Sequence, residues 1–151
     1  MTTDDPENIK AFNYIVLSVL TKLYGEFPKP IEIRGLRFVL ETVLKKGPEA
    51  AEAKFSHLFN PTMMWLRQEG FIIFESNSDR DVFVGVTLTL RGLTILGFVP
   101  NSLFGPKETV FRRAKRALDK GIDEAAFGAI KRIATEAFKL MVQFSRSAGN
   151  I

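Results

Sequence analysis

The fold is decided by two short stretches, WLRQEGFI at residues 65–72 and LTLRGLTIL at residues 88–96. In the first, a helical pattern ends at Gly70, because glycine readily adopts the left-handed backbone that often follows a helix end. Leu66 and Phe71, on either side of this turn, are expected to fill the core beneath it. In the second, Thr89 is expected to cap a new helix, since a threonine oxygen accepts a hydrogen bond from the first helical turn.

The chain between these stretches predicts a two-stranded hairpin. Residues 71–76 and 82–90 are rich in β-branched and aromatic side chains, and a short polar segment joins them. On the N-terminal side, apolar residues recur at helical spacing over 7–24 and again over 36–44. The apolar face of the first helix consists of Ile9, Phe12, Val16, Val19, Leu20 and Leu23. The short segment Ile31–Ile33 between these two helices favours a small strand.

The third helix is expected to begin at Pro61. Asn60 is a favourable N-cap residue, and proline suits the first position of a helix because its missing N–H would have no partner there. A separate Ala-rich helical turn is expected at 49–58, just before this start. After the hairpin, a short helix at 90–96 leads to a predicted linker at 100–106.

Two further helices are predicted beyond the linker, at 107–120 and 122–146, with Gly121 between them. Residues 1–100 hold 11 Lys+Arg and 12 Asp+Glu, whereas residues 101–151 hold 10 and 5. The net charge of +4 therefore comes from the C-terminal third. A basic segment on a near-neutral body favours an anionic partner.

The order of helix, short strand, two helices, hairpin and helix resembles the winged helix-turn-helix superfamily over residues 8–98. Residues 65–72 are similar to the end of a recognition helix that turns into the first wing strand. Residues 88–96 are similar to the leucine-threonine-x-basic-glycine exit from the wing into the next helix. The resemblance implies an α+β, mostly helical fold, with a winged-helix domain at 7–99 (a three-helix core plus a two-stranded wing). The C-terminal helices predicted at 107–147 lie beyond the resemblance. Winged helices bind DNA, RNA or protein, so the resemblance does not choose between these functions.

Composition excludes several classes of protein. The 151 residues are 46% apolar, which is enough for one domain with a continuous core. With no cysteine, neither a disulfide framework nor a thiolate nucleophile is available. The polar, acidic start MTTDDP does not resemble a secretory signal, and no apolar run approaches the ~20 residues of a membrane-spanning helix. We therefore expect a cytoplasmic protein with no transmembrane segment.

The sequence does not predict an enzyme. His57 is the sole histidine and has no metal-ligand partner at matching spacing, so we expect a partly buried structural histidine. No phosphate loop, dinucleotide motif or nucleophile elbow is present. We expect no catalytic residue, no metal and no cofactor.

By resemblance to DNA-binding winged helices, the third helix would enter the major groove and the wing would contact the DNA backbone or minor groove. The side chains expected to face outward on this helix are Thr62, Trp65, Arg67 and Gln68. Arginine and glutamine can recognise guanine and adenine edges. Cations are scarce, however, because Glu69 follows Arg67 closely and two aspartates flank Arg80 at the wing tip. Phosphate contacts from Lys and Arg dominate duplex affinity, so the winged body alone is not expected to bind DNA tightly.

The strongest basic pattern lies at 107–120. One face of this predicted helix is apolar (Val110, Phe111, Ala114, Ala117 and Leu118), and the other carries Arg112, Arg113, Lys115, Arg116 and Lys120. Such a helix can pack its apolar face on the body, follow nucleic-acid phosphates or lie on an anionic membrane surface. The candidate nucleic-acid-binding residues are Arg34, Arg37, Thr62, Arg67, Gln68, Arg80, Arg112, Arg113, Lys115 and Arg116.

A second set of residues indicates a protein interface. Four consecutive large apolar residues at 63–66 cannot all face inward, so Met64 and Trp65 are either covered by the C-terminal helices or contact a partner. The last helix has a wide apolar stripe, which requires either a two-fold homodimer through the C-terminal helices or folding back on the body. The candidate interface residues are Met64, Trp65, Ile130, Ile133, Ala137, Phe138 and Met141.

The leading expectation is a non-catalytic winged-helix protein that binds nucleic acid, in particular double-stranded DNA, or regulates transcription. The alternative is a protein-interaction module of the same fold. Association of the C-terminal segment with a membrane surface is a third hypothesis.

Overall fold

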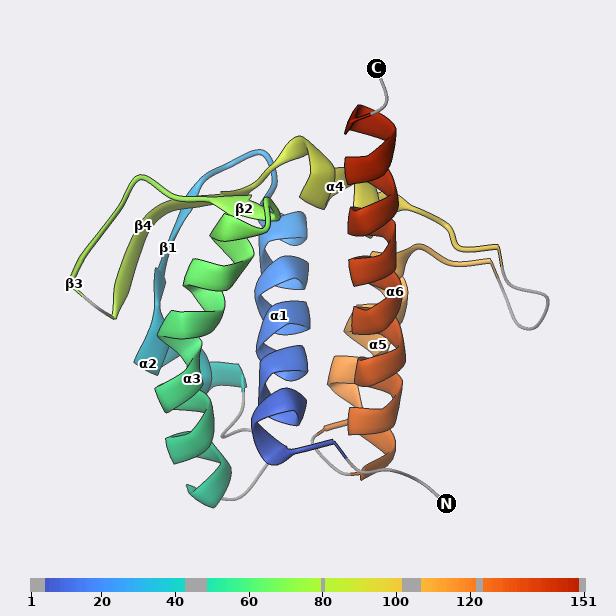
Figure 1. Ribbon diagram of the computed structural model, residues 1–151. Coiled ribbons are helices and arrows are strands. Elements are labelled where there is room, and N and C mark those ends of the chain that lie inside the picture. The colour runs from blue at the N-terminus through green and yellow to red at the C-terminus, as the bar shows by residue number, and fades with distance from the viewer. Residues whose placement is uncertain (1–4, 43–48, 80, 102–106, 122–123, 150–151) are drawn as a thin grey trace.

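The computed structural model describes residues 5–42, 49–79, 81–101, 107–121 and 124–149, and these form an α+β fold (Figure 1). The helices in this part of the chain are α1 (Glu7–Glu26), α2 (Gly35–Thr42), α3 (Glu49–Gln68), α4 (Leu90–Gly97), α5 (Val110–Asp119) and α6 (Glu124–Gly149). The strands are β1 (Ile31–Arg34), β2 (Ile72–Ile73), β3 (Ser76–Asp79) and β4 (Val82–Leu88).

Helix α1 lies at the centre of the helices, with α3 on one side and α5 and α6 on the other (Figure 1). The sequence predicted an amphipathic helix with a single apolar face that included Ile9. In the structure Ile9 is exposed, whereas Ile15 and Leu17, outside that face, are buried. The reason is that the C-terminal helices cover a second side of α1, so burial extends around most of its circumference.

Helix α3 is continuous through Pro61, so the prediction of two helices with a break at Asn60 is wrong. Proline removes one backbone hydrogen bond from a helix interior and crowds the preceding turn, which disfavours the helix by about 3 kcal/mol. The apolar stripe nevertheless runs unbroken across this position, because its members on both sides of Pro61 are buried: Phe55, Phe59, Met63 and Leu66. Burying each such side chain contributes about 1.5–3 kcal/mol, which outweighs the disadvantage of the proline.

The antiparallel sheet has β4 between β1 and β2, and β3 also pairs with β4. Register places Ile33 opposite Phe83 and Ile72 opposite Leu88, and all four side chains are buried. The sequence predicted one strand over 71–76, but this segment contains β2 and the start of the separate β3. The predicted hairpin is therefore present with a divided first strand.

The junction between α3, the sheet and α4 has the structure that the sequence predicts. Gly70 has a positive φ of 85°, and Leu66 and Phe71 are buried. The Thr89 hydroxyl donates a hydrogen bond to the Gly70 carbonyl at 2.6 Å and accepts one from the Gly92 N–H at 3.0 Å. Gly92 lies so close to this turn that a Cβ on it would be 2.4 Å from the Phe71 carbonyl oxygen.

The two C-terminal helices fold back on α1 and share its core. Helix α5 begins later than predicted, because the Thr109 hydroxyl accepts a hydrogen bond from the Arg112 N–H at 3.1 Å and caps the helix there. Gly121, with φ of 106°, separates α5 from α6 as expected. Most of the predicted linker at 100–106 lies outside the described residues.

Candidate functional site

The outer surface of α3 offers few groups for reading DNA. Thr62 was predicted to face outward, but it is buried, and its hydroxyl donates a hydrogen bond to the Leu58 carbonyl at 2.8 Å. The prediction that Thr62 faces outward is wrong because this residue lies beside Met63 on the side of α3 that faces the core. Arg67 is exposed, with its guanidinium carbon 4.5 Å from the centre of the Phe74 ring. Gln68 is exposed as predicted.

Two candidate cations, Arg34 in β1 and Arg37 in α2, are paired with glutamates of the same chain. Arg34 Nε lies 3.3 Å from Glu32 Oε2, and Arg37 Nε lies 3.0 Å from Glu41 Oε1. Both pairs are exposed, so they contribute little stability. They do cancel much of the positive potential that these arginines would offer a phosphate. Arg80, the wing-tip candidate, lies outside the described residues.

Helix α5 presents the most basic surface among the structured segments. Arg113 points toward α6 and lies 3.8 Å from Glu136, and Arg116 pairs with Glu108. Arg112 and Lys115 are exposed, and neither has a carboxylate partner within the described part of the chain. These two cations and Phe111 line a hollow on α5 together with Glu108, Arg116 and Asp119.

Trp65 is covered by the C-terminal helices, whereas Met64 is not. The Trp65 ring lies 5.0 Å from Phe12 of α1 and 5.5 Å from Phe138 of α6, both in edge-to-face contacts. Phe138 also packs on Phe71. Met64 retains 44% of its surface exposed. Of the predicted pair, only Met64 is available to a partner.

The apolar stripe of α6 is used inside the chain. Ile130 and Ala137 are completely buried and Met141 nearly so, while Ile133 is half-buried against the core. This burial comes from contacts of α6 with α1, α4 and α5. The homodimer was predicted because the apolar stripe of α6 had to be covered. Other helices of the same chain cover it.

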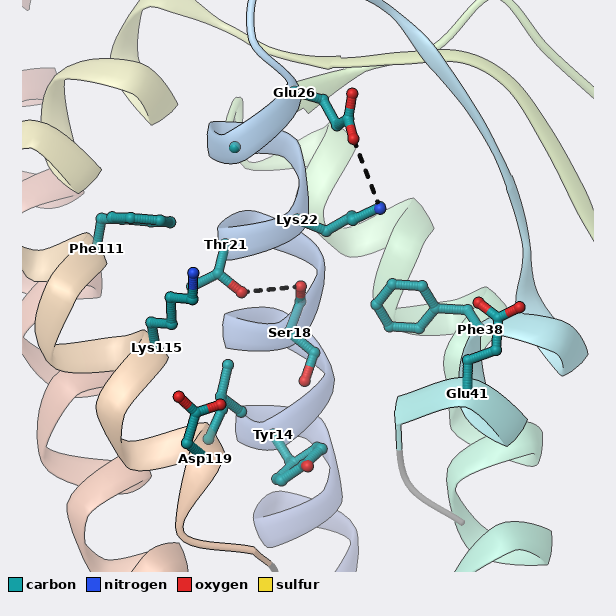
Figure 2. A pocket seen from close by; sticks show the side chains of 12 residues that line it. Tyr14, Ser18, Thr21, Lys22, Glu26, Phe38, Glu41, Phe111, Lys115 and Asp119 are labelled. Carbon is teal, nitrogen blue, oxygen red and sulfur yellow. Dashed lines mark hydrogen bonds and ion pairs between the residues drawn. The ribbon is translucent and has the colours of Figure 1, made fainter. Parts of the chain in front are cut away.

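A cleft of about 400 Å³ lies between α1, α2 and α5 (Figure 2). We call it the α1–α2–α5 cleft. Its lining residues are Tyr14, Ser18, Thr21, Lys22, Gly25, Glu26, Phe38, Glu41, Phe111, Lys115, Leu118 and Asp119. Figure 2 shows α1 as its floor, with Phe111 of α5 on one side and Phe38 of α2 on the other.

Tyr14 at the base of this cleft has a perturbed phenol. Its side chain is almost completely buried, and its ring makes edge contacts with Phe55 and Phe127. Burial raises the pKa of Tyr14, because the phenolate would lose its hydration, and the negative charge of Asp119 raises it further. The phenol therefore stays neutral at physiological pH.

The described residues contain no cluster suited to bind a metal ion, because no group of three or more His, Asp or Glu side chains there is arranged to hold one. His57 is exposed, not partly buried as predicted, because it lies on the outer side of α3 between the inward-facing Phe55 and Phe59. Over the same residues, no helix is both long enough and apolar enough to cross a membrane.

No protein-family model, no curated protein and no solved structure matches this chain.

The α1–α2–α5 cleft was missed by the sequence analysis. Phe111 had been placed on the apolar face of its helix with no assigned role, and Tyr14 and Phe38 had not been singled out. Tyr14 and Phe38 come from the consecutive helices α1 and α2, whereas Phe111 comes from α5, far along the chain. Only the docking of α5 on α1, which the sequence left open, brings them together.

Proposed function

We propose that this chain is a non-catalytic winged-helix protein of the cytoplasm that binds nucleic acid, and that α5 supplies its main phosphate contacts. The observation that carries this proposal is the pair of exposed cations on α5, Arg112 and Lys115, which have no carboxylate partner among the described residues. Unpaired cations on one helix face release counterions from nucleic acid, and this release supplies most non-specific affinity.

The arrangement of elements supports the winged-helix part of the proposal. The order α1, β1, α2, α3, hairpin (β2, β3 and β4) and α4 follows the order that the resemblance implies, and β1 joins the hairpin by pairing with β4. Arg67 and Gln68 are exposed at the C-terminal end of α3, next to the hairpin. They are the residues proposed to contact bases.

The phosphate contacts are assigned to α5 because the candidate arginines Arg34 and Arg37 are paired with carboxylates. A phosphate at either arginine would have to compete with its glutamate. A duplex contacted by α3 alone would meet Arg67 as its one arginine, followed closely by Glu69. The α5 face is the stronger source of positive potential.

A charge-matched pair of double variants tests this proposal. Arg112→Gln with Lys115→Gln removes two exposed cations of α5 that have no carboxylate partner among the described residues, and Arg34→Gln with Arg37→Gln removes two paired ones. Binding of random-sequence duplex DNA is measured by fluorescence anisotropy over a range of salt concentrations. Since each phosphate contact contributes about 0.9 to the salt slope, the first variant should lower that slope by about 2 and the second should leave it nearly unchanged.

Equal effects of the two variants would mean that only net charge matters, and would remove the assigned role of α5. No binding by the parent protein, even at low salt, would refute the nucleic-acid proposal as a whole.

A protein partner on α3 is the second candidate function. The observation that favours it is an exposed stripe at helical spacing that carries neither Lys nor Arg: His57, Pro61, Met64 and Gln68. An uncharged helix face with an exposed methionine suits a protein surface better than a phosphate backbone. A photo-crosslinking residue in place of Met64 should capture a partner in cells, whereas the same residue in place of the exposed Val142 on α6 should not.

A two-fold dimer through α6 is not part of the proposal. Its predicted interface residues Ile130 and Ala137 have no exposed surface in the single chain.

A further inference from the structure

We propose that the α1–α2–α5 cleft binds a small, flat aromatic molecule that carries one anionic group, of the aromatic carboxylate class. Its volume of about 400 Å³ is within the range of small-molecule sites in proteins. The cleft joins α5 to the helices α1 and α2 of the predicted winged-helix body, so a bound molecule would contact both parts. This inference does not depend on nucleic-acid binding.

The walls of the cleft are aromatic and are held in place by further rings. Phe111 and Phe38 face each other across α1, with Tyr14 at the base (Figure 2). Each of these three packs on a ring that does not line the cleft: Phe111 on Tyr24 at 4.5 Å, Phe38 on Phe59 at 5.4 Å and Tyr14 on Phe55 at 5.2 Å between ring centroids. Such bracing opposes collapse of the side chains into the cleft. A flat aromatic ligand would therefore find a preformed apolar site and lose little free energy in ordering it.

The charges around the cleft favour an anion at one position. Lys22 Nζ lies 3.6 Å from Glu26 Oε1, and Glu41 pairs with Arg37, which does not line the cleft. The charges within each of these two pairs largely compensate one another. Lys115 has no carboxylate partner within the described residues. In Figure 2 its ammonium group points across the cleft toward Thr21 of α1.

Asp119 lies one turn further along α5, on the Tyr14 side of Lys115 (Figure 2). A ligand's anionic group is therefore expected on the Thr21 side of the lysine, with its ring system between Phe111 and Phe38. A charge-assisted hydrogen bond to the Lys115 ammonium would then fix its orientation.

Three probes of nearly equal shape test the charge preference: indole-3-acetate, the neutral indole-3-acetamide, and the cationic tryptamine. Binding to the full chain is measured by titration calorimetry, and two-dimensional amide NMR locates the site through the Gly25 resonance, with Gly70 as a distant reference. We expect indole-3-acetate to bind most tightly and to shift Gly25 but not Gly70. Lys115→Gln should weaken the acetate about tenfold, to the level of the acetamide, and leave the acetamide unaffected.

A steric variant tests the location without depending on a core substitution. Gly25 lines the cleft, and a Cβ on it would have no atom within 4 Å, so Gly25→Leu should fill the cleft while the protein still folds. Gly128→Leu is the matched control, because Gly128 is also helical with open space around it but does not line the cleft. Binding should be lost in the first variant and kept in the second.

Three results would overturn the proposal: no saturable binding of any probe at millimolar concentration, tighter binding of tryptamine than of indole-3-acetate, or unchanged binding in Gly25→Leu.

Discussion

Gly92→Ala is expected to destabilise the protein, although alanine is the better helix former. The added Cβ would lie 2.4 Å from the Phe71 carbonyl oxygen, whereas carbon and oxygen in close contact are separated by about 3.3 Å or more. Helix α4 would therefore have to move away from the Gly70–Phe71 turn by about 1 Å. That movement would stretch the hydrogen bonds of Thr89 to the Gly70 carbonyl, at 2.6 Å, and to the Phe71 carbonyl, at 3.0 Å.

The expected magnitude follows from three contributions. Overpacking of this kind disfavours the folded state by about 1–3 kcal/mol, and weakening two hydrogen bonds adds about 1 kcal/mol. Alanine's better helix propensity offsets at most about 1 kcal/mol. The free energy of unfolding should fall by about 2 kcal/mol, which corresponds to about 6 °C in Tm for a chain of this size.

Gly128→Ala provides the matched comparison and should have the opposite sign. Gly128 lies within α6, and a Cβ there would have no atom within 4 Å. With no clash, only the helix propensity changes, so stability should rise by about 0.5–1 kcal/mol. Urea unfolding followed by circular dichroism and by the fluorescence of Trp65, the sole tryptophan, measures both variants. The reasoning is refuted if Gly92→Ala is as stable as the parent protein or shifts in the same direction as Gly128→Ala.

Three further predictions concern the turn, the aromatic junction and the cleft. Thr89→Ala should lower the free energy of unfolding by about 1–2 kcal/mol because the α4 cap is lost. Thr89→Ser should recover most of that free energy. Urea unfolding of the parent protein and both variants measures the differences. Trp65→Ala should lower the free energy of unfolding by about 2 kcal/mol. Met64→Ala, at an exposed position, should change it by less than about 0.5 kcal/mol. Similar losses in the two variants would contradict the packing of Trp65 described above. Because the folded pKa of Tyr14 is raised, its stabilising contribution is complete below the unfolded pKa of about 10 and is lost as pH rises through the folded value. The stability of the parent protein relative to Tyr14→Phe should therefore fall above about pH 10, and a constant difference through alkaline pH would argue against it.

The elements with local signals could be predicted from the sequence. Gly70 and Thr89 determine the turn and the α4 cap through their own backbone and side-chain chemistry, which depends on a few neighbouring residues. Pro61 shows the opposite case. Its local preference predicts a helix start, but the tertiary burial of Phe59 and Met63 on either side keeps α3 continuous.

The candidate site was less predictable, because it depends on docking. The charge pattern of α5 indicated which cations lie together, but it did not show that Arg113 and Arg116 would be paired while Arg112 and Lys115 would not. Each pairing needs a partner whose position depends on tertiary structure or on side-chain geometry. The same holds for the α1–α2–α5 cleft, whose walls meet only after α5 packs on α1.

The central position of α1 has a consequence for how the chain folds during synthesis. Helix α1 leaves the ribosome well before α5 and α6, the two helices that cover one of its sides. Until then, α1 rings that pack on these helices, such as Phe12 on Phe138 and Tyr24 on Phe111, lack those neighbours. The incomplete chain should therefore bind chaperones or aggregate readily, and a nonsense mutation after α4 should yield an insoluble product rather than a smaller working domain.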